Sequence, residues 1–538
     1  MRKMKKIMIL LILPFMSACT LFNYRLSTIQ EFYSNEQSYK FSHFRTPTNI
    51  DETINNGNEL IDFIKQDTNE TNKFILGVNK FFKSFTLVID AIYITRTNYY
   101  ATSNQEYRSE YFNLYDAYQT LNEIRYNILL ESSKTNYKDI VFSDMTDEEI
   151  KDILSRLYTN EDIANISSAM EEISSNAEEV YNQHYQSQEY ESLMYDLLVE
   201  YKDLVSQYNE LKNIDDYLSY SYENTYSRDY TPEHILSFYE AVKTNLVPVF
   251  NNYDIGDINV LSQEDRTYLN NFEKVNFRNY SLNVIPSIES YIDLVKPLRS
   301  AYNRLWSSGY YCFSDSDSSL GTAYTASLAY ASEPILYFSK YYQNVFTFIH
   351  EFGHYTDAYY NGSDETAMDI SEIHSQGNEL LFASYLEDHK SLPISDEALD
   401  CLIRSQLKQM MRAIFYGTYV SEVEQYVFYN DISNKEETIN QIHEINSNYG
   451  GIMDAKYCWA PILGSPAYYI SYATSSIGAL ELYINSREDY GKAVNQYIGL
   501  IDRDEDENSI SSLMNKTGLK PINSSSAVNY IAEYFDNN

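Results

Sequence analysis

The sequence predicts a mainly helical protein with two or more subdomains. Helical patterns of polar and aromatic residues dominate its 538 residues, while Gly (16) and Pro (11) are scarce. A chain of this length can bury a large core and divide into subdomains. No internal repeat is visible, and the one segment that reads as a strand is Glu333–Ser339. We therefore expect an all-α fold class with a small β element.

The helical patterns suggest a division into four parts. Residues 1–19 form a targeting segment, 20–70 a tether with the first helical segments, 71–220 an N-terminal helical domain and 221–538 a second domain. Thr146, followed by Glu149, predicts a capped helix start. Thr231 and Pro232 predict another, with Thr231 as the N-cap and Pro232 at the first helical position. This second start supports a boundary near residues 215–232.

The N-terminus has the features of an export signal. Four basic residues precede the apolar run 7–15, which is too short to span a bilayer. The sequence Met16-Ser-Ala-Cys19 follows and resembles a bacterial lipobox. We expect cleavage before Cys19, lipidation of Cys19 and attachment to a membrane of the cell envelope. The alternative is an ordinary signal peptide in which Cys19 is incidental.

Charge and cysteine content exclude several classes of protein. The formal net charge is -37, and no cluster of Lys and Arg follows the N-terminus. Nucleic-acid binding needs a basic surface, so we expect none. The remaining cysteines, Cys312, Cys401 and Cys458, are too few for a disulfide scaffold and are expected to be buried and unpaired. We expect a monomer.

The most informative stretch is His350-Glu-Phe-Gly-His354. Two histidines four residues apart lie on one face of a helix, where both can reach one metal ion. Glu351 lies beside the first, as in the helix of zinc peptidases. Apolar residues recur at helical spacing on the opposite face: Val345, Phe348, Ile349, Phe352, Tyr355 and Tyr359. The stretch therefore predicts an amphipathic helix that binds one Zn²⁺ per chain.

A catalytic zinc usually takes a third protein ligand and leaves one position open. The candidates that follow the helix are Asp364, Glu365, Asp369, Glu372, His374 and Glu379. Glu372 is the best of them, because it leaves room for a turn and a returning helix. Glu379 shares its helical face and suits a role in orienting a ligand imidazole, as does Asp357. His374 lies on another face of that helix.

Hydrolysis at such a site needs a base and donors for the developing oxyanion. Zinc lowers the pKa of a bound water to about 7, and Glu351 can take its proton and pass it to the leaving amine. A tyrosine cluster, Tyr468, Tyr469 and Tyr472, offers phenol donors. With 55 tyrosines in the chain, aromatic packing is the competing explanation for this cluster.

Three segments in order resemble the thimet oligopeptidase/oligoendopeptidase F family. They are Glu333–His354, Ser371–Glu379 and Ser465–Ala473, with Gly309 and Cys312 as a further match. The resemblance covers about 225–490. It implies a clam-like, two-part helical molecule with a deep channel, zinc on His350, His354 and Glu372, and Glu351 as base. It also implies cleavage of internal bonds of short peptides, with Glu333–Ser339 as an edge strand that pairs with the substrate backbone.

Two positions depart from the family pattern. Members usually carry a histidine shortly before the tyrosine cluster, but residues 458–464 contain none. Asp357 stands where a histidine is often found. Loss of one oxyanion donor typically lowers the rate about 100- to 1,000-fold. The alternative function is therefore a surface lipoprotein that keeps the fold and binds peptides with little or no cleavage.

Overall fold

The protein is described here by a computed structural model, which covers residues 50–143, 145–274, 284–308, 310–319, 323–362, 367–503 and 509–537. Several predicted features lie outside these ranges: the signal segment with Cys19, residues 20–49 of the tether, Gly309, Asp364 and Glu365. The chain divides into two compact units. Unit 1 comprises the described residues of Met1–Glu161, Lys274–Asn276 and Lys296–Glu365, and unit 2 comprises the others.

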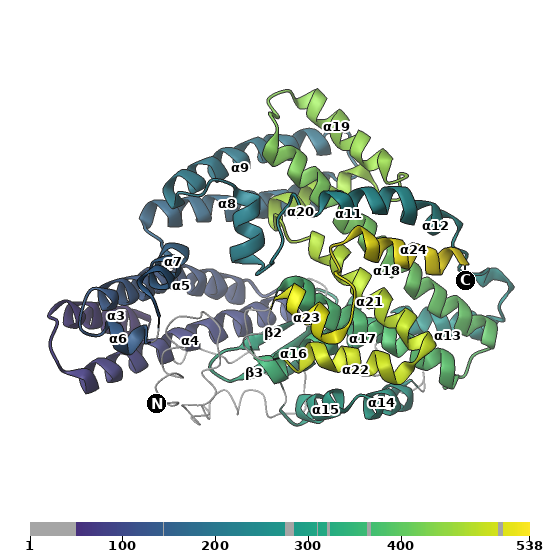
Figure 1. Cartoon of the computed structure of the whole chain (residues 1–538), viewed down its shortest axis with the longest axis horizontal. Coiled ribbons are helices and arrows are strands. Elements are labelled where there is room, and N and C mark those ends of the chain that lie inside the picture. Colours follow the sequence, from purple (N-terminus) through teal and green to yellow (C-terminus); the bar gives the residue numbers. More distant parts are fainter. Residues whose placement is uncertain are drawn as a thin grey trace. The chain divides into compact units, whose positions relative to one another are not determined.

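The described part of unit 1 begins with three long helices that pack side by side (Figure 1): α3 (Ile50–Lys65), α4 (Thr71–Thr102) and α5 (Gln105–Ser133). Their facing sides carry apolar side chains with no exposed surface, among them Ile64, Phe81 and Ile128. The short helices α6 (Lys138–Val141) and α7 (Asp147–Leu157) follow. The predicted cap at Thr146 is confirmed, because its hydroxyl accepts the Glu149 N–H and the Glu149 carboxylate accepts the Thr146 N–H.

After α15 (Lys296–Ser308), unit 1 contains a small sheet of β1 (Tyr311–Phe313), β2 (Ala323–Leu328) and β3 (Glu333–Phe338). The strand order is β1-β3-β2, with β1 parallel and β2 antiparallel to β3. The strand predicted near Glu333 is confirmed, but its predicted edge position is wrong, because β3 pairs on both sides. Its all-buried apolar run suits a central strand, whereas most of β2 is half-exposed.

The histidine stretch forms a helix, as predicted. After η7 (Lys340–Tyr342), α16 spans Val345–Asn361, and the Asn344 side chain caps it by accepting the Thr347 N–H at 2.8 Å. The predicted apolar face is fully buried from Val345 to Tyr355 and packs against α15, β2 and β3, while Tyr359 at its end is exposed. This burial fixes which face of α16 carries the histidines.

Unit 2 is built around three helices in mutual contact: α17 (Met368–His389), α18 (Asp396–Tyr429) and α21 (Ile470–Glu488). Glycine allows the close approach of α18 and α21, since a Cβ on Gly417 would lie 2.4 Å from the carbonyl oxygen of Tyr469. The surrounding helices are α8 (Glu161–His184), α9 (Tyr190–Lys212), α10 (Tyr217–Tyr220), α11 (Leu236–Ala241), α12 (Val247–Asn252), α13 (Gln263–Lys274), α14 (Ile285–Leu294), α19 (Lys435–Asn448), α20 (Trp459–Gly464), α22 (Tyr490–Ile501), α23 (Ile510–Thr517) and α24 (Ser525–Asn537). Short 3₁₀ or π turns are η3 (Ser221–Thr225), η4 (Val242–Leu246), η5 (Ile258–Val260) and η8 (Ala455–Cys458).

One predicted helix start is wrong. Thr231 does not cap a helix; its carbonyl accepts the His234 N–H in a turn, and its N–H donates to the His234 ring. The helix α11 begins only at Leu236. The His234 side chain accepts the Thr231 N–H locally, so this segment forms a turn and the helix starts later.

The cysteine prediction holds in the described part of the chain, where Cys312, Cys401 and Cys458 are buried and form no disulfide. No helix within the described ranges has both the length and the apolar character that crossing a bilayer requires. The fold class is confirmed as mainly helical with a small sheet.

Candidate metal centre and its surroundings

The histidine pair and Glu351 lie on α16. His350 and His354 lie one turn apart on α16, half-buried, with ring centroids 5.0 Å apart. Glu351 is 7% exposed. The hydroxyl of Thr325, on β2, lies 3.0 Å from Glu351 Oε2 and 3.0 Å from the Glu351 carbonyl oxygen. A strand that packs on α16 therefore holds the carboxylate that the sequence predicts to be the base.

Glu372 lies on the second turn of α17. Its side chain is buried, and both of its carboxylate oxygens accept hydrogen bonds. Tyr468 Oη donates to Oε1 at 2.8 Å, and the Ser375 hydroxyl is shared between Oε2 at 3.3 Å and the Glu372 carbonyl oxygen at 2.9 Å. A carboxylate fixed in this way has a defined direction for binding a cation.

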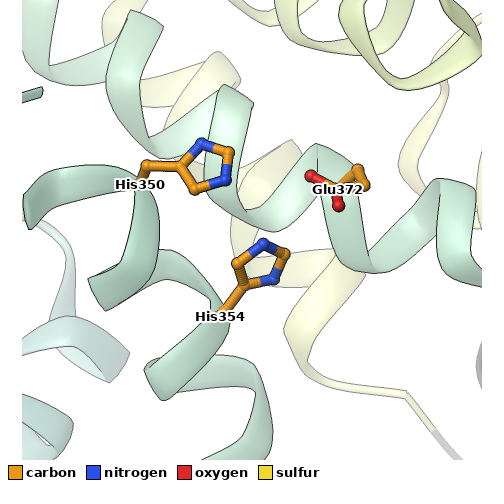
Figure 2. A group of neighbouring side chains, drawn as sticks. All are labelled: His350, His354 and Glu372. Atoms are coloured by element: carbon orange, nitrogen blue, oxygen red, sulfur yellow. The ribbon is translucent and has the colours of Figure 1, made fainter. Parts of the chain in front are cut away.

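The three predicted ligands come together in the structure (Figure 2). One ligand atom each of His350, His354 and Glu372 lies within 4.8 Å of the others. Two imidazole nitrogens and one carboxylate oxygen are a donor set that zinc takes in catalytic sites, where the fourth position stays open. The residues present therefore fit a zinc ion.

The other described candidates for the third ligand have different partners. Asp369 forms an ion pair with Arg228, Oδ2 to Nε, at 2.8 Å. His374 Nε2 lies 3.1 Å from Arg503 Nη1. Glu379 accepts a hydrogen bond from the Gln406 side chain. Glu372 is thus the only one of these four in the metal cluster.

The two predicted orienting residues are both buried, at 8% exposure. Glu379 lies two turns beyond Glu372 on α17, where Gln406 of α18 binds it. Asp357 accepts the side-chain N–H of Asn361 at 2.7 Å, within α16. Their proposed action on the ligand imidazoles stays a prediction.

The tyrosine cluster divides into two environments. Tyr468 Oη donates to Glu372 and lies 3.1 Å from Tyr472 Oη, whereas the Tyr469 ring packs edge-on against Tyr416, with centroids 5.3 Å apart. Burial and the neighbouring Glu372 carboxylate raise the pKa of the Tyr468 phenol well above its usual value. Tyr468 therefore stays protonated and remains a donor. The site roles proposed for Tyr469 and Tyr472 stay predictions.

A buried polar network around this cluster was not predicted from the sequence. Arg228, between η3 and α11, binds Asp369 of α17 and also donates to the carbonyl oxygen of Ala467. Arg228 and Asp369 are separated by 141 residues, so no local pattern connects them. The only available signal was the run of tyrosines around Arg228, which form cation–π contacts with its guanidinium.

The fold of this chain is similar to the folds of solved peptidase structures. The PZ peptidase A structure, which carries an inhibitor, has a TM-score of 0.66 at 15% identity and covers 93% of this chain and 99% of its own. A protein assigned as an oligoendopeptidase F has a TM-score of 0.66 at 13% identity, with 93% and 98% covered. Oligoendopeptidase F from Enterococcus faecium has a TM-score of 0.55 at 14% identity, with 90% and 96% covered.

These likenesses confirm the predicted fold along nearly the whole chain, including the region before residue 225. At the level of sequence, no protein-family model matches the chain, and no curated protein matches it. Low identity with a shared fold is expected where packing tolerates many apolar substitutions.

Proposed function

We propose that this protein is a zinc metallopeptidase that cleaves internal bonds of short peptides. The observation that carries the proposal is the cluster of His350, His354 and Glu372 with the acid Glu351 on the same helix. The similar structures support it, since they include an oligoendopeptidase F and a PZ peptidase with an inhibitor.

Each side chain of the site then has a distinct role. A bound zinc would supply a Lewis acid and lower the pKa of a water molecule to about 7. Glu351, oriented by Thr325, would take a proton from the attacking water and deliver it to the leaving amine. Tyr468 would donate its phenol hydrogen to the oxyanion when that charge develops, giving up its hydrogen bond to Glu372.

The substrates would be short, unstructured peptides, as the resemblance implies for a deep channel. In the sheet, the outer edge of β2 rather than β3 would pair with a peptide backbone, because β2 is the last strand on that side. Its register places Thr325, the residue next to Glu351, opposite Leu336 of β3.

We also propose that the protein is a bacterial lipoprotein, exported and held on a membrane through a lipidated Cys19. The support is the basic and apolar segment before Cys19, followed by the lipobox-like sequence. With its strongly acidic composition, the protein would need this anchor to stay at an anionic membrane. It would act as a monomer and bind no nucleic acid.

One experiment tests the enzymatic proposal. The chain without residues 1–19 is purified, its zinc content is measured, and a broad library of quenched peptides is assayed beside Glu351→Gln. We expect one zinc per chain in both proteins and cleavage only by the unmodified one. If both hold zinc and neither cleaves any peptide, the proposal fails and a peptide-binding lipoprotein becomes the better description.

A further inference from the structure

The turn that precedes α21 is held by side chains from distant parts of unit 2. Ala467, in this turn, is buried and has a φ of 65°, a left-handed conformation that a non-glycine residue rarely adopts. Its N–H donates to Glu424 Oε1 at 2.9 Å, and its carbonyl oxygen accepts from Arg228 Nη1 at 2.7 Å. The carbonyl oxygen of Pro466 accepts from Tyr226 Oη at 3.1 Å. Three backbone groups just before Tyr468 are thus fixed from outside the turn.

Arg228 is itself fixed by a fully buried ion pair. Arg228 and Asp369 both have 0% side-chain exposure. Arg228 Nη2 donates to Ser471 Oγ at 2.6 Å, and Tyr230 Oη donates to Asp369 Oδ1 at 2.7 Å. Ser471 and Thr474 donate to the same carboxylate. The cation holds the pKa of Asp369 below its usual value despite burial, so the pair stays ionised.

This pair connects the two segments that meet at the candidate metal ligand. Asp369 lies one helical turn before Glu372 on α17. Arg228 donates to the carbonyl oxygens of Ala467 and of Tyr468 itself, the latter at 3.4 Å. Tyr468 and Glu372 then touch through their 2.8 Å hydrogen bond. The guanidinium therefore sets the position of the turn relative to α17, and with it the position of the phenol relative to the carboxylate.

A purely stabilising role does not explain why an arginine stands here. A buried ion pair can often be replaced by apolar residues without loss of stability. The planar fork of arginine is needed because it reaches Asp369, the Ala467 carbonyl oxygen and Ser471 at once, which the single ammonium of lysine cannot reproduce.

We propose that Arg228 is a positioning residue for the peptidase reaction, which places the Tyr468 phenol against Glu372 by holding the turn 465–469 to α17. This inference rests on the proposed function. The residue touches neither substrate nor metal and acts only through Tyr468.

A double-mutant comparison tests this dependence. Arg228→Lys, Tyr468→Phe and the double variant are assayed for kcat and KM on one peptide. We expect Tyr468→Phe to lower kcat about 100-fold. We expect Arg228→Lys to lower kcat about 10-fold or more with KM nearly unchanged, because the phenol is misplaced. The kcat of the double variant should be within about twofold of the kcat of Tyr468→Phe alone. If the two losses multiply, Arg228 does not act through Tyr468 and the inference is overturned.

The matched control is Arg487→Lys. Arg487 also forms an ion pair in unit 2, Nη1 to Asp388 Oδ1 at 2.8 Å, but it is partly exposed and lies at the other end of α21. The Arg487→Lys substitution should leave kcat unchanged. If Arg228→Lys does not fold, Tyr226→Phe replaces it, since it removes only the hydrogen bond to Pro466; the same non-additivity with Tyr468→Phe is then required.

A second readout does not depend on peptidase activity. Amide hydrogen exchange of residues 465–469 should be at least about tenfold faster in Arg228→Lys than in the unmodified protein, with α22 unchanged. Unaltered exchange at the turn contradicts the inference. If the unmodified protein cleaves no peptide, the proposed function fails, whereas the exchange result still decides whether Arg228 holds the turn.

Discussion

At the level of single residues, a strand orients the acid that we propose as the base, Glu351. The sequence predicts the acid itself, because it lies between two histidines at helical spacing. Its partner Thr325 is 26 residues away, on β2, and reaches Glu351 only through the packing of the strand on α16. A base that is already oriented loses less freedom when the transition state forms.

Removing this partner should slow the reaction without removing the metal. Thr325→Val keeps the side-chain shape and deletes the hydroxyl that binds Glu351. We expect kcat to fall by about 10- to 150-fold, equivalent to the about 1.5–3 kcal/mol of one hydrogen bond to a charged group. Zinc content, measured by metal analysis, should stay at one per chain.

A second Thr→Val change provides the comparison. Thr356, also on α16, is fully buried, and its hydroxyl donates only to the Phe352 carbonyl oxygen within the helix. Thr356→Val should leave kcat close to that of the unmodified protein. Equal losses in the two variants would show that the hydroxyl of Thr325 has no special role.

At the scale of elements, close helix contact positions the tyrosine cluster. Gly417 of α18 faces the start of α21, where a Cβ would lie 2.4 Å from the Tyr469 carbonyl oxygen and 2.8 Å from the Ala473 nitrogen. Both atoms belong to the backbone, so neither can move without displacing the helix. Packed interiors tolerate such an insertion poorly.

Gly417→Ala should therefore push the first turn of α21 away from α18. We expect a loss of about 1–3 kcal/mol in the free energy of unfolding and a lower kcat, because the tyrosines move with the turn. Gly491→Ala serves as the control, since its nearest neighbour would be a side-chain oxygen at 3.4 Å. Thermal unfolding measures the stability of both variants, and peptide assays measure their kcat. An unchanged kcat in Gly417→Ala would contradict the prediction.

A buried acid couples α4 to the hairpin of β2 and β3. Asp90 is fully buried, and its carboxylate accepts the N–H groups of Tyr330 at 3.1 Å and Ala331 at 2.9 Å. Burial raises the pKa of Asp90 to about 7, more than these hydrogen bonds lower it. The folded protein therefore binds this proton more tightly than the unfolded chain does.

Because the pKa of Asp90 is raised in the folded protein, the stability of the fold should depend on pH. The stabilisation from the Asp90 proton is complete below the ordinary pKa near 3.8 and is lost as the pH rises through about 7. Relative to Asp90→Asn, which stays neutral, the unmodified protein should lose up to about 4 kcal/mol of stability between pH 4 and 8. Urea unfolding at a series of pH values measures the difference. Parallel curves for the two proteins would contradict it.

For the whole molecule, zinc should stabilise the folded state. A ligand that binds only the folded protein raises its stability by mass action. Chelation should therefore lower the midpoint of thermal unfolding by several degrees, and one equivalent of zinc should restore it. His354→Ala, which lacks a ligand, should respond to neither treatment. A chelator-insensitive unmodified protein would argue against a zinc site.

The proposed membrane anchor at Cys19 also concerns the whole molecule. In a bacterial host, the full chain should partition into the detergent phase of an extract, whereas Cys19→Ser should appear in the aqueous phase, because the acyl chains are absent. Blotting the two phases measures this distribution. Cys401→Ser is the control for loss of a thiol, since Cys401 is buried in unit 2. Aqueous partition of the unmodified protein would rule out the anchor.

Sequence patterns between neighbouring residues predicted much of the local structure of this protein. The spacing of His350 and His354, the apolar face of α16, the cap at Thr146 and the strand at Glu333 depend on residues within one or two turns of each other, and all four are present. Spacing also favoured Glu372 among six candidates, and the structure brings it to the histidines.

The contacts between segments far apart in the sequence follow from tertiary packing. Asp369 and Glu372 are equally good ligands by composition, but Arg228 neutralises Asp369 from 141 residues away and leaves Glu372 facing the histidines. The central place of β3 and the partner of Glu351 likewise depend on strand pairing and packing. Periodicity reports which face of an element is buried, but it carries no information on which element covers that face.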